Sequence, residues 1–164
     1  MFSLPLSSRS SGKFLLVTLP RIAPGFDTNR IAYTKEPLKL DYYNDSVWSD
    51  TPQKMLLPIL VSAFERTGVF KAVMVPPAPS LADLRIDVDV IRFQHECMIH
   101  PSRVRVTART KVVEMKSGHV LGTQVFEVVE TTISEDAYGA VRAFNIAIQN
   151  LLVNILPFTL QYLG

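Results

Sequence analysis

The sequence predicts an α+β two-layer sandwich, in which two helices cover one face of a mostly antiparallel sheet of four or more strands. Two observations predict it. Polar and apolar residues alternate along Leu84–Gln94, Val104–Lys116 and His119–Thr132, as they do in half-buried strands. Two other stretches, 52–68 and 137–156, repeat apolar residues at helical spacing. The helices are therefore expected to cover the apolar face of a three-stranded meander.

Charge patterning supports the pairing of the first two central stretches. The polar face of the first is mainly acidic, through Asp87 and Asp89, whereas that of the second is basic. Opposite charges on facing strands stabilise an antiparallel pair by about 0.2–1 kcal/mol each. The second and third stretches are joined by Lys116-Ser117-Gly118, and a short loop that ends in glycine suits a hairpin.

Shorter strands are expected before the meander. Phe14–Leu19 is an apolar run bounded by lysine and proline, and it reads as a buried strand. Asn29–Tyr33 and Leu38–Tyr43 are predicted to form a β-hairpin or an extended arm. Phe70–Val75 is a fourth short strand candidate. Ser7–Gly12 has the composition of a flexible linker.

Cap residues mark the ends of the first predicted helix, and apolar residues at helical spacing mark the second. Ser49 or Asp50 can cap the first, and Pro52 suits its first turn. Gly68 is a plausible left-handed cap at its end, and Pro58 predicts a kink. The second is expected over 137–156. The final 22 residues of the chain carry no charge, but polar residues and a proline interrupt them, which favours a core helix over a membrane span.

Bulk composition is that of an ordinary globular domain. A length of 164 residues predicts one domain, 1–164, with a flexible start over residues 1–12. The net charge is only +2 and the basic residues are scattered, which argues against a nucleic-acid partner. Cys97 is the only cysteine, so no internal disulfide can form. The start has neither a basic region nor a long apolar run, so either the protein is cytosolic or the sequence begins after a removed leader.

One group of residues could in principle carry chemistry. His95, Glu96, Cys97 and His100 lie together between the first two meander strands, in a predicted loop, and their side-chain types could ligate zinc. The group has one cysteine, and no second ligand pair with zinc-site spacing occurs elsewhere. No paired-carboxylate, serine-centred or phosphate-loop motif is present. We therefore expect no catalytic residue, no metal and no cofactor; the alternative is a small hydrolase or metalloprotein centred on His95–His100.

Apolar surface is the more informative signal. Keeping the strand alternation in phase predicts a patch on the sheet face opposite the helices. Its members are Ile91, Phe93, Val113, Met115, Leu121, Val125 and Val129. Ile146 and Val153 lie off the main stripe of the second helix, which predicts burial on a second side. Because soluble monomers rarely expose large apolar patches, these nine residues are candidate partner or oligomer contacts, and a homo-oligomer is expected.

The order of several short motifs resembles the family of ABC-type transport auxiliary lipoproteins, the group that contains the paraquat-inducible lipoprotein. The motifs extend over nearly the whole chain. They are Phe2-Ser3-Leu4, Asn29–Tyr33, the segment Val47–Pro52 with its tryptophan, Leu84–Phe93 with its Arg-Phe pair, the hairpin Lys116–Phe126 and the helix Ala140–Leu151.

The resemblance implies a non-enzymatic envelope lipoprotein that assists an MCE-type ABC system in moving phospholipid or another hydrophobic molecule between membranes of Gram-negative bacteria. It implies MCE-domain or ABC transport components as partners, and lipid as a possible ligand. It also implies a periplasmic domain that is held at a membrane, the outer membrane by preference, by a lipidated cysteine. Cys97 is in mid-domain, so that cysteine is expected upstream of Met1.

Overall fold

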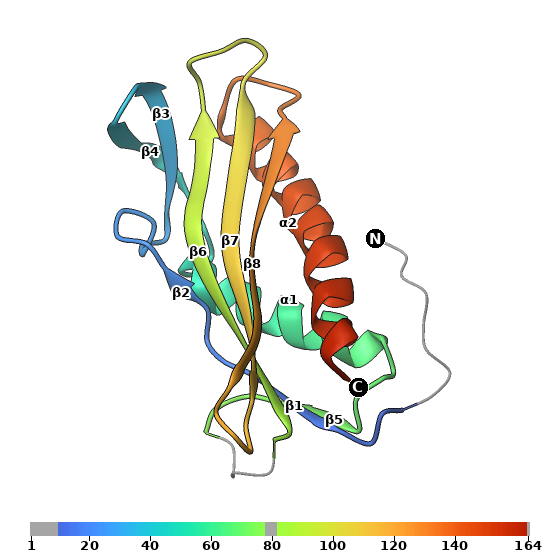
Figure 1. Ribbon diagram of the computed structural model, residues 1–164. Helices are drawn as coiled ribbons and strands as arrows, with labels where there is room; N and C mark the ends of the chain where they lie inside the picture. The colour runs from blue at the N-terminus through green and yellow to red at the C-terminus, as the bar shows by residue number, and fades with distance from the viewer. Residues whose placement is uncertain (1–9, 78–81, 164) are drawn as a thin grey trace.

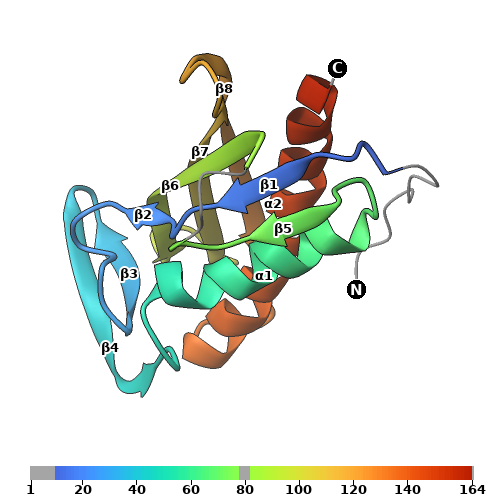
Figure 2. The ribbon, with the colours of Figure 1, turned by 90° about the horizontal axis from the view of Figure 1, so that it is seen from below.

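One face of an eight-stranded sheet is covered by two helices (Figures 1 and 2). A computed structural model describes residues 10–77 and 82–163 of the chain. The predicted α+β sandwich is confirmed. In chain order the elements are β1 (Phe14–Val17), β2 (Arg21–Ile22), β3 (Arg30–Glu36), β4 (Lys39–Val47), α1 (Pro52–Arg66), β5 (Ala72–Met74), β6 (Leu84–Glu96), β7 (Arg103–Glu114), β8 (Val120–Thr131), α2 (Ala137–Leu160) and the 3-10 helix η1 (Gln161–Leu163).

The long strand β6 is the centre of the sheet. One of its edges pairs with β7 and then β8 in the predicted antiparallel meander. Its other edge pairs in parallel with three short strands in succession: β1 at Leu84–Ile86, β2 at Asp89–Val90 and β3 at Gln94–Glu96. The expected charge pairing is present in the register, since Asp87 faces Lys111 and Asp89 faces Arg109.

A β-bulge in β6 overturns part of the sequence-based assignment of faces. The register shifts between Val90 and Arg92, so Ile91 is an additional residue and the alternation reverses after it. Phe93, which we predicted on the uncovered face, is therefore 2 % exposed in the core. Its ring stacks on Phe144 of α2, with 4.5 Å between the ring centroids. The prediction for Phe93 was wrong because one inserted residue changes the face of every side chain after it.

The core between sheet and helices contains an aromatic group around the entry to α1. Trp48 is half-buried and makes edge contacts with Phe93 and Phe144, at centroid distances of 5.4 and 5.3 Å. Its backbone N–H donates to the Asn29 carbonyl at 2.6 Å. The tryptophan thus fixes the chain to the start of β3 immediately before α1 begins.

The helix ends differ in detail from the sequence expectation. α1 begins at Pro52, and its N-cap residue is Thr51 instead of the predicted Ser49 or Asp50. The Asp50 carboxylate accepts the backbone N–H of Thr51 at 2.8 Å. α2 is capped by Asp136, whose carboxylate accepts the Gly139 N–H at 2.9 Å. The helical stretch Ala137–Leu163 is long and apolar enough to cross a membrane, with a mean hydropathy of 1.4, but half of it is buried within the fold. That burial against the sheet fits the predicted core helix.

Two of the remaining predicted strands are shorter than expected, because β1 ends at Val17 and β5 is limited to Ala72–Met74. The expected hairpin is present as β3 and β4, and both of its strands are longer than predicted. A flexible start was predicted for residues 1–12. Residues 1–9 of it, which include Phe2-Ser3-Leu4, lie outside the described residues. Ser11 is held by the fold, since its N–H donates to the Val69 carbonyl at 2.6 Å.

Candidate functional site

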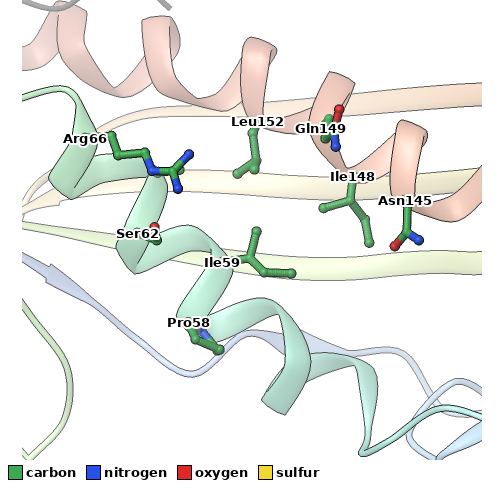
Figure 3. Close-up of a pocket in the computed structure, with 9 residues that line it drawn as sticks. Pro58, Ile59, Ser62, Arg66, Asn145, Ile148, Gln149 and Leu152 are labelled. Carbon is green, nitrogen blue, oxygen red and sulfur yellow. The ribbon is translucent and has the colours of Figure 1, made fainter. Parts of the chain in front are cut away.

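A groove lies between the two helices. It has a volume of about 570 Å³. Figure 3 shows that side chains from both helices face it. Its lining is Pro58, Ile59, Ser62, Ala63 and Arg66 from α1, and Asn145, Ile148, Gln149 and Leu152 from α2. Apolar side chains therefore form much of its wall, and amide, hydroxyl and guanidinium groups are distributed among them.

Exposed apolar residues extend this surface along α2. Ile146 and Val153 are 45 % and 39 % exposed, and Ile59 of α1 is 39 % exposed. The two α2 residues are thus on the outer side of the helix, as their place off the main stripe predicted. Whether a partner or second copy covers them stays a prediction.

The uncovered sheet face is not the contiguous apolar patch that we expected. Val125 and Val129 of β8 are exposed, but Glu127 lies between them and pairs with Arg105 at 2.9 Å. Glu96 accepts hydrogen bonds from Arg103 and Arg105 on the same face, both at 2.8 Å. An ion-pair network therefore interrupts the apolar residues of this face.

The other members of the predicted patch are largely covered. Val113 is 3 % exposed, and Ile91, Met115 and Leu121 are half-buried. Leu121 occupies a second register shift, between Val112 and Val113 on the facing strand, and packs against the core. The premise that these residues form one exposed surface was wrong: one register shift moves Phe93 into the core, and a second places Leu121 against it.

The network around Glu96 shows strong electrostatic stabilisation. Burial alone would raise the pKa of Glu96, but hydrogen bonds from Arg105, Arg103 and Gln94 outweigh it and lower the pKa to about 2. The carboxylate is thus ionised at neutral pH, and its role is to join β6 to β7.

His95 lies in β6, not in a loop as predicted, and is fully buried in a chain of polar groups. The Thr132 hydroxyl donates to the Ser102 carbonyl at 3.0 Å, so the Ser102 hydroxyl donates to Thr132 Oγ1 at 2.5 Å. Ser102 Oγ then accepts from Nε2–H of His95 at 2.7 Å, and Nδ1 is left to accept from the Tyr43 hydroxyl at 2.8 Å. Burial lowers the pKa of His95, which favours this neutral form.

The serine–histidine contact resembles part of a hydrolase site, but its setting is structural. Ser102 and His95 are both 0 % exposed, so a substrate cannot reach the hydroxyl. The group on Nδ1 is the Tyr43 phenol, whose pKa burial raises further above neutrality, rather than a carboxylate that would stabilise an imidazolium. Burial also raises the pKa of the Cys97 thiol, which keeps it protonated and weakly nucleophilic.

The predicted group of four does not converge on one point. His100 contacts the Glu135 carboxylate at 3.2 Å, and Glu96 is engaged by arginines on the other face of the sheet. Within residues 10–77 and 82–163, no three His, Cys, Asp or Glu side chains are arranged to hold a metal ion. Sequence reasoning missed Ser102 and Thr132, because only the folded strand ends bring them to His95.

The described residues thus form an α+β sandwich that exposes apolar surface along its helices, while the His95–Ser102 pair is sealed in the core. The sequence assigns it further. The chain belongs to the family of ABC-type transport auxiliary lipoprotein components, whose model matches residues 5–156. No curated protein sequence matches it.

Solved structures share the fold. A protein of the DUF330 family from Xanthomonas campestris is 24 % identical and superposes with a TM-score of 0.84, with 94 % of this chain and 88 % of that one covered. The hypothetical protein CT253 from Chlamydia trachomatis is 8 % identical, with a TM-score of 0.58 over 93 % and 98 % of the two chains. The PelC dodecamer from Paraburkholderia phytofirmans is 13 % identical, with a TM-score of 0.54 over 93 % of each chain. At these identities the similarity establishes the fold alone.

Proposed function

We propose that this chain is a non-enzymatic auxiliary component of an MCE-type ABC system that moves phospholipid or another hydrophobic molecule between membranes. The observation that carries the proposal is the family match over residues 5–156. The sealed position of His95 and Ser102 supports a role without turnover. Its partners are the MCE-domain or ABC components of the transporter.

The proposed location is the periplasm, at the outer membrane, through a lipidated cysteine upstream of the domain. The lipoprotein character of the family supports an anchor. The test is affinity purification of the native protein from envelope membranes, followed by mass spectrometry of its N-terminus, co-purified proteins and lipids. Transporter subunits and an acylated cysteine are expected. Recovery without any transport component, at the solubilisation conditions that retain other envelope complexes, would contradict the proposal.

The same proposal includes self-association through the α1–α2 surface. Exposed Ile59, Ile146 and Val153 beside a largely apolar groove support it, because a monomer would leave them in water. The structurally similar PelC is described as a dodecamer. An oligomer is therefore expected in light scattering at micromolar concentration.

Charge-insertion variants test which surface holds the subunits. Val153→Glu is expected to give a folded monomer, because a carboxylate would be buried in the contact. Val129→Glu is the matched control, a similarly exposed valine on the uncovered sheet face. A monomeric parent protein would refute self-association. If only Val129→Glu is monomeric, the subunits contact one another through the uncovered sheet face and not through the α1–α2 surface.

A further inference from the structure

Three loops meet at the end of the molecule where β6 finishes (top of Figure 1). They are the β3–β4 turn, the β6–β7 loop over 97–102 and the β8–α2 loop over 132–136. Backbone hydrogen bonds hold them side by side. The Cys97 N–H donates to the Thr34 carbonyl at 2.8 Å, and the Thr132 N–H donates to the Ser102 carbonyl at 2.9 Å. The loops therefore form one surface.

Each loop presents apolar side chains to solvent. Leu38 is 109 % exposed, Met98 49 %, Ile99 45 % and Ile133 70 %. We call these four residues the loop end. Single exposed apolar residues are ordinary, but four at the tips of three adjoining loops are not.

Leu38 is also a backbone outlier. Its φ of 63° lies in the left-handed region, where glycine or asparagine is usual and a branched apolar residue is rare. The turn thus uses an unfavourable residue and leaves its side chain wholly in water. Neither feature stabilises the fold, so the leucine is better explained by an external contact.

The polar groups around the loop end suit phosphate. Lys35 and Lys39 flank Leu38, with Glu36 between them. The other acidic groups of the loops are engaged internally: Glu135 accepts the Ser102 N–H, and Asp136 caps α2. A lysine stem can lie along an apolar surface while its ammonium reaches a phosphate.

The described chain begins at the opposite end of the sheet. Ser11 is bonded to Val69, and the Phe14 N–H donates to Asp83, directly before the first residue of β6, Leu84. A domain tethered through its N-terminus can therefore direct the loop end away from its anchor.

We propose that the loop end inserts its four apolar side chains into the interfacial layer of a phospholipid bilayer, with Lys35 and Lys39 at lipid phosphates. A bilayer fits better than a protein because all four side chains are at least 45 % exposed and two lysines flank Leu38, so apolar groups are presented together with cations that can reach lipid phosphates. A protein interface needs a contiguous core packed to the density of an interior, whereas fluid lipid accommodates each projecting side chain singly. The inference rests on the proposed function and names the surface with which the transport component would meet a membrane.

Vesicle flotation of the whole chain tests the inference. The vesicles are phosphatidylcholine, and separately phosphatidylethanolamine with phosphatidylglycerol. Leu38→Asn is the main variant, since asparagine tolerates the left-handed backbone and the turn is retained. Its partition constant is expected to fall about tenfold, and that of the double variant with Ile133→Ser about a hundredfold. Val120→Asn is the matched control, because Val120 is 52 % exposed at the opposite end of the sheet and its change is expected to have no effect.

Each contrary outcome has a definite meaning. No flotation of the parent protein, or an equal loss in Val120→Asn, overturns the membrane contact. If the parent protein does not float with vesicles, and Leu38→Asn abolishes co-purification of transporter subunits, the loop end binds a protein and the inference is wrong. If vesicle binding follows the expected order but no transport component co-purifies, the proposed function fails and the membrane contact stands.

Discussion

Phe93 provides the sharpest test of the β-bulge in β6. Without the bulge this residue would lie on the uncovered sheet face, where truncation to alanine costs little. With the bulge it is 2 % exposed and stacked on Phe144, with Trp48 against its edge. Truncation of a buried phenylalanine costs about 3–5 kcal/mol, and the lost aromatic pairing is included in that cost.

The expected effect of Phe93→Ala is in the middle of this range, about 4 kcal/mol, since the buried ring contacts two other aromatic side chains. Urea unfolding monitored by the fluorescence of Trp48 measures this loss of stability, because the single tryptophan of the chain contacts the ring that the substitution removes. Val129→Ala, on the uncovered face, is the control and should change stability by less than about 0.5 kcal/mol. A loss below about 1 kcal/mol for Phe93→Ala, similar to the control, would refute the bulge and return Phe93 to the surface.

Three further predictions concern the packing and polar networks. Trp48→Ala should cost about 2–3 kcal/mol in the same assay, less than a fully buried tryptophan, because its ring is half-buried; a loss under about 1 kcal/mol would contradict its anchoring role. Glu96→Gln should cost about 2 kcal/mol at pH 7. Because the folded pKa of Glu96 is lowered to about 2, the stabilisation is complete above pH 4.5 and declines as pH falls towards 2, and the variant should lack that component of acid unfolding. Burial lowers the pKa of His95 below 6.5, so the stability that depends on its neutral form is present above pH 6.5 and declines on acidification. In His95→Asn this part of the pH dependence should be absent. If the free energy of unfolding of the variant falls between pH 6.5 and 5 as steeply as that of the parent protein, the assignment is refuted.

Long-range regularity explains what the sequence could predict. β6, β7 and β8 each contain twelve or thirteen residues, so their alternation is repeated often enough to identify strands and their pairing. The helices are equally readable from their stripes and from Pro52. A single inserted residue, Ile91, reverses this alternation for Phe93 and for every later residue of β6, so a phase carried on through Val90 assigns those side chains to the wrong face.

Contacts between distant segments explain the rest. Ser102 and Thr132 are separated by 30 residues and meet only because β7 and β8 pair over their full length. The α1–α2 groove depends in the same way on how two helices cross over the sheet, and neither stripe specifies that geometry. Proximity in the sequence groups His95 with Cys97 and His100, but in the fold His95 contacts Tyr43, Ser102 and Cys97, and His100 contacts Glu135 instead.

The buried network of His95 also has a consequence for the surface above it. Tyr43 belongs to β4, Ser102 lies directly before β7, and Thr132 follows β8, so one polar chain joins the segments that carry all three exposed loops. Because each of these side chains is hydrogen-bonded to the next, the chain of bonds restrains these segments relative to one another. In the proposed membrane contact, such a base would hold the segments below apolar tips such as Leu38 in place. The residues that first suggested catalysis thus join the segments that carry the three loops.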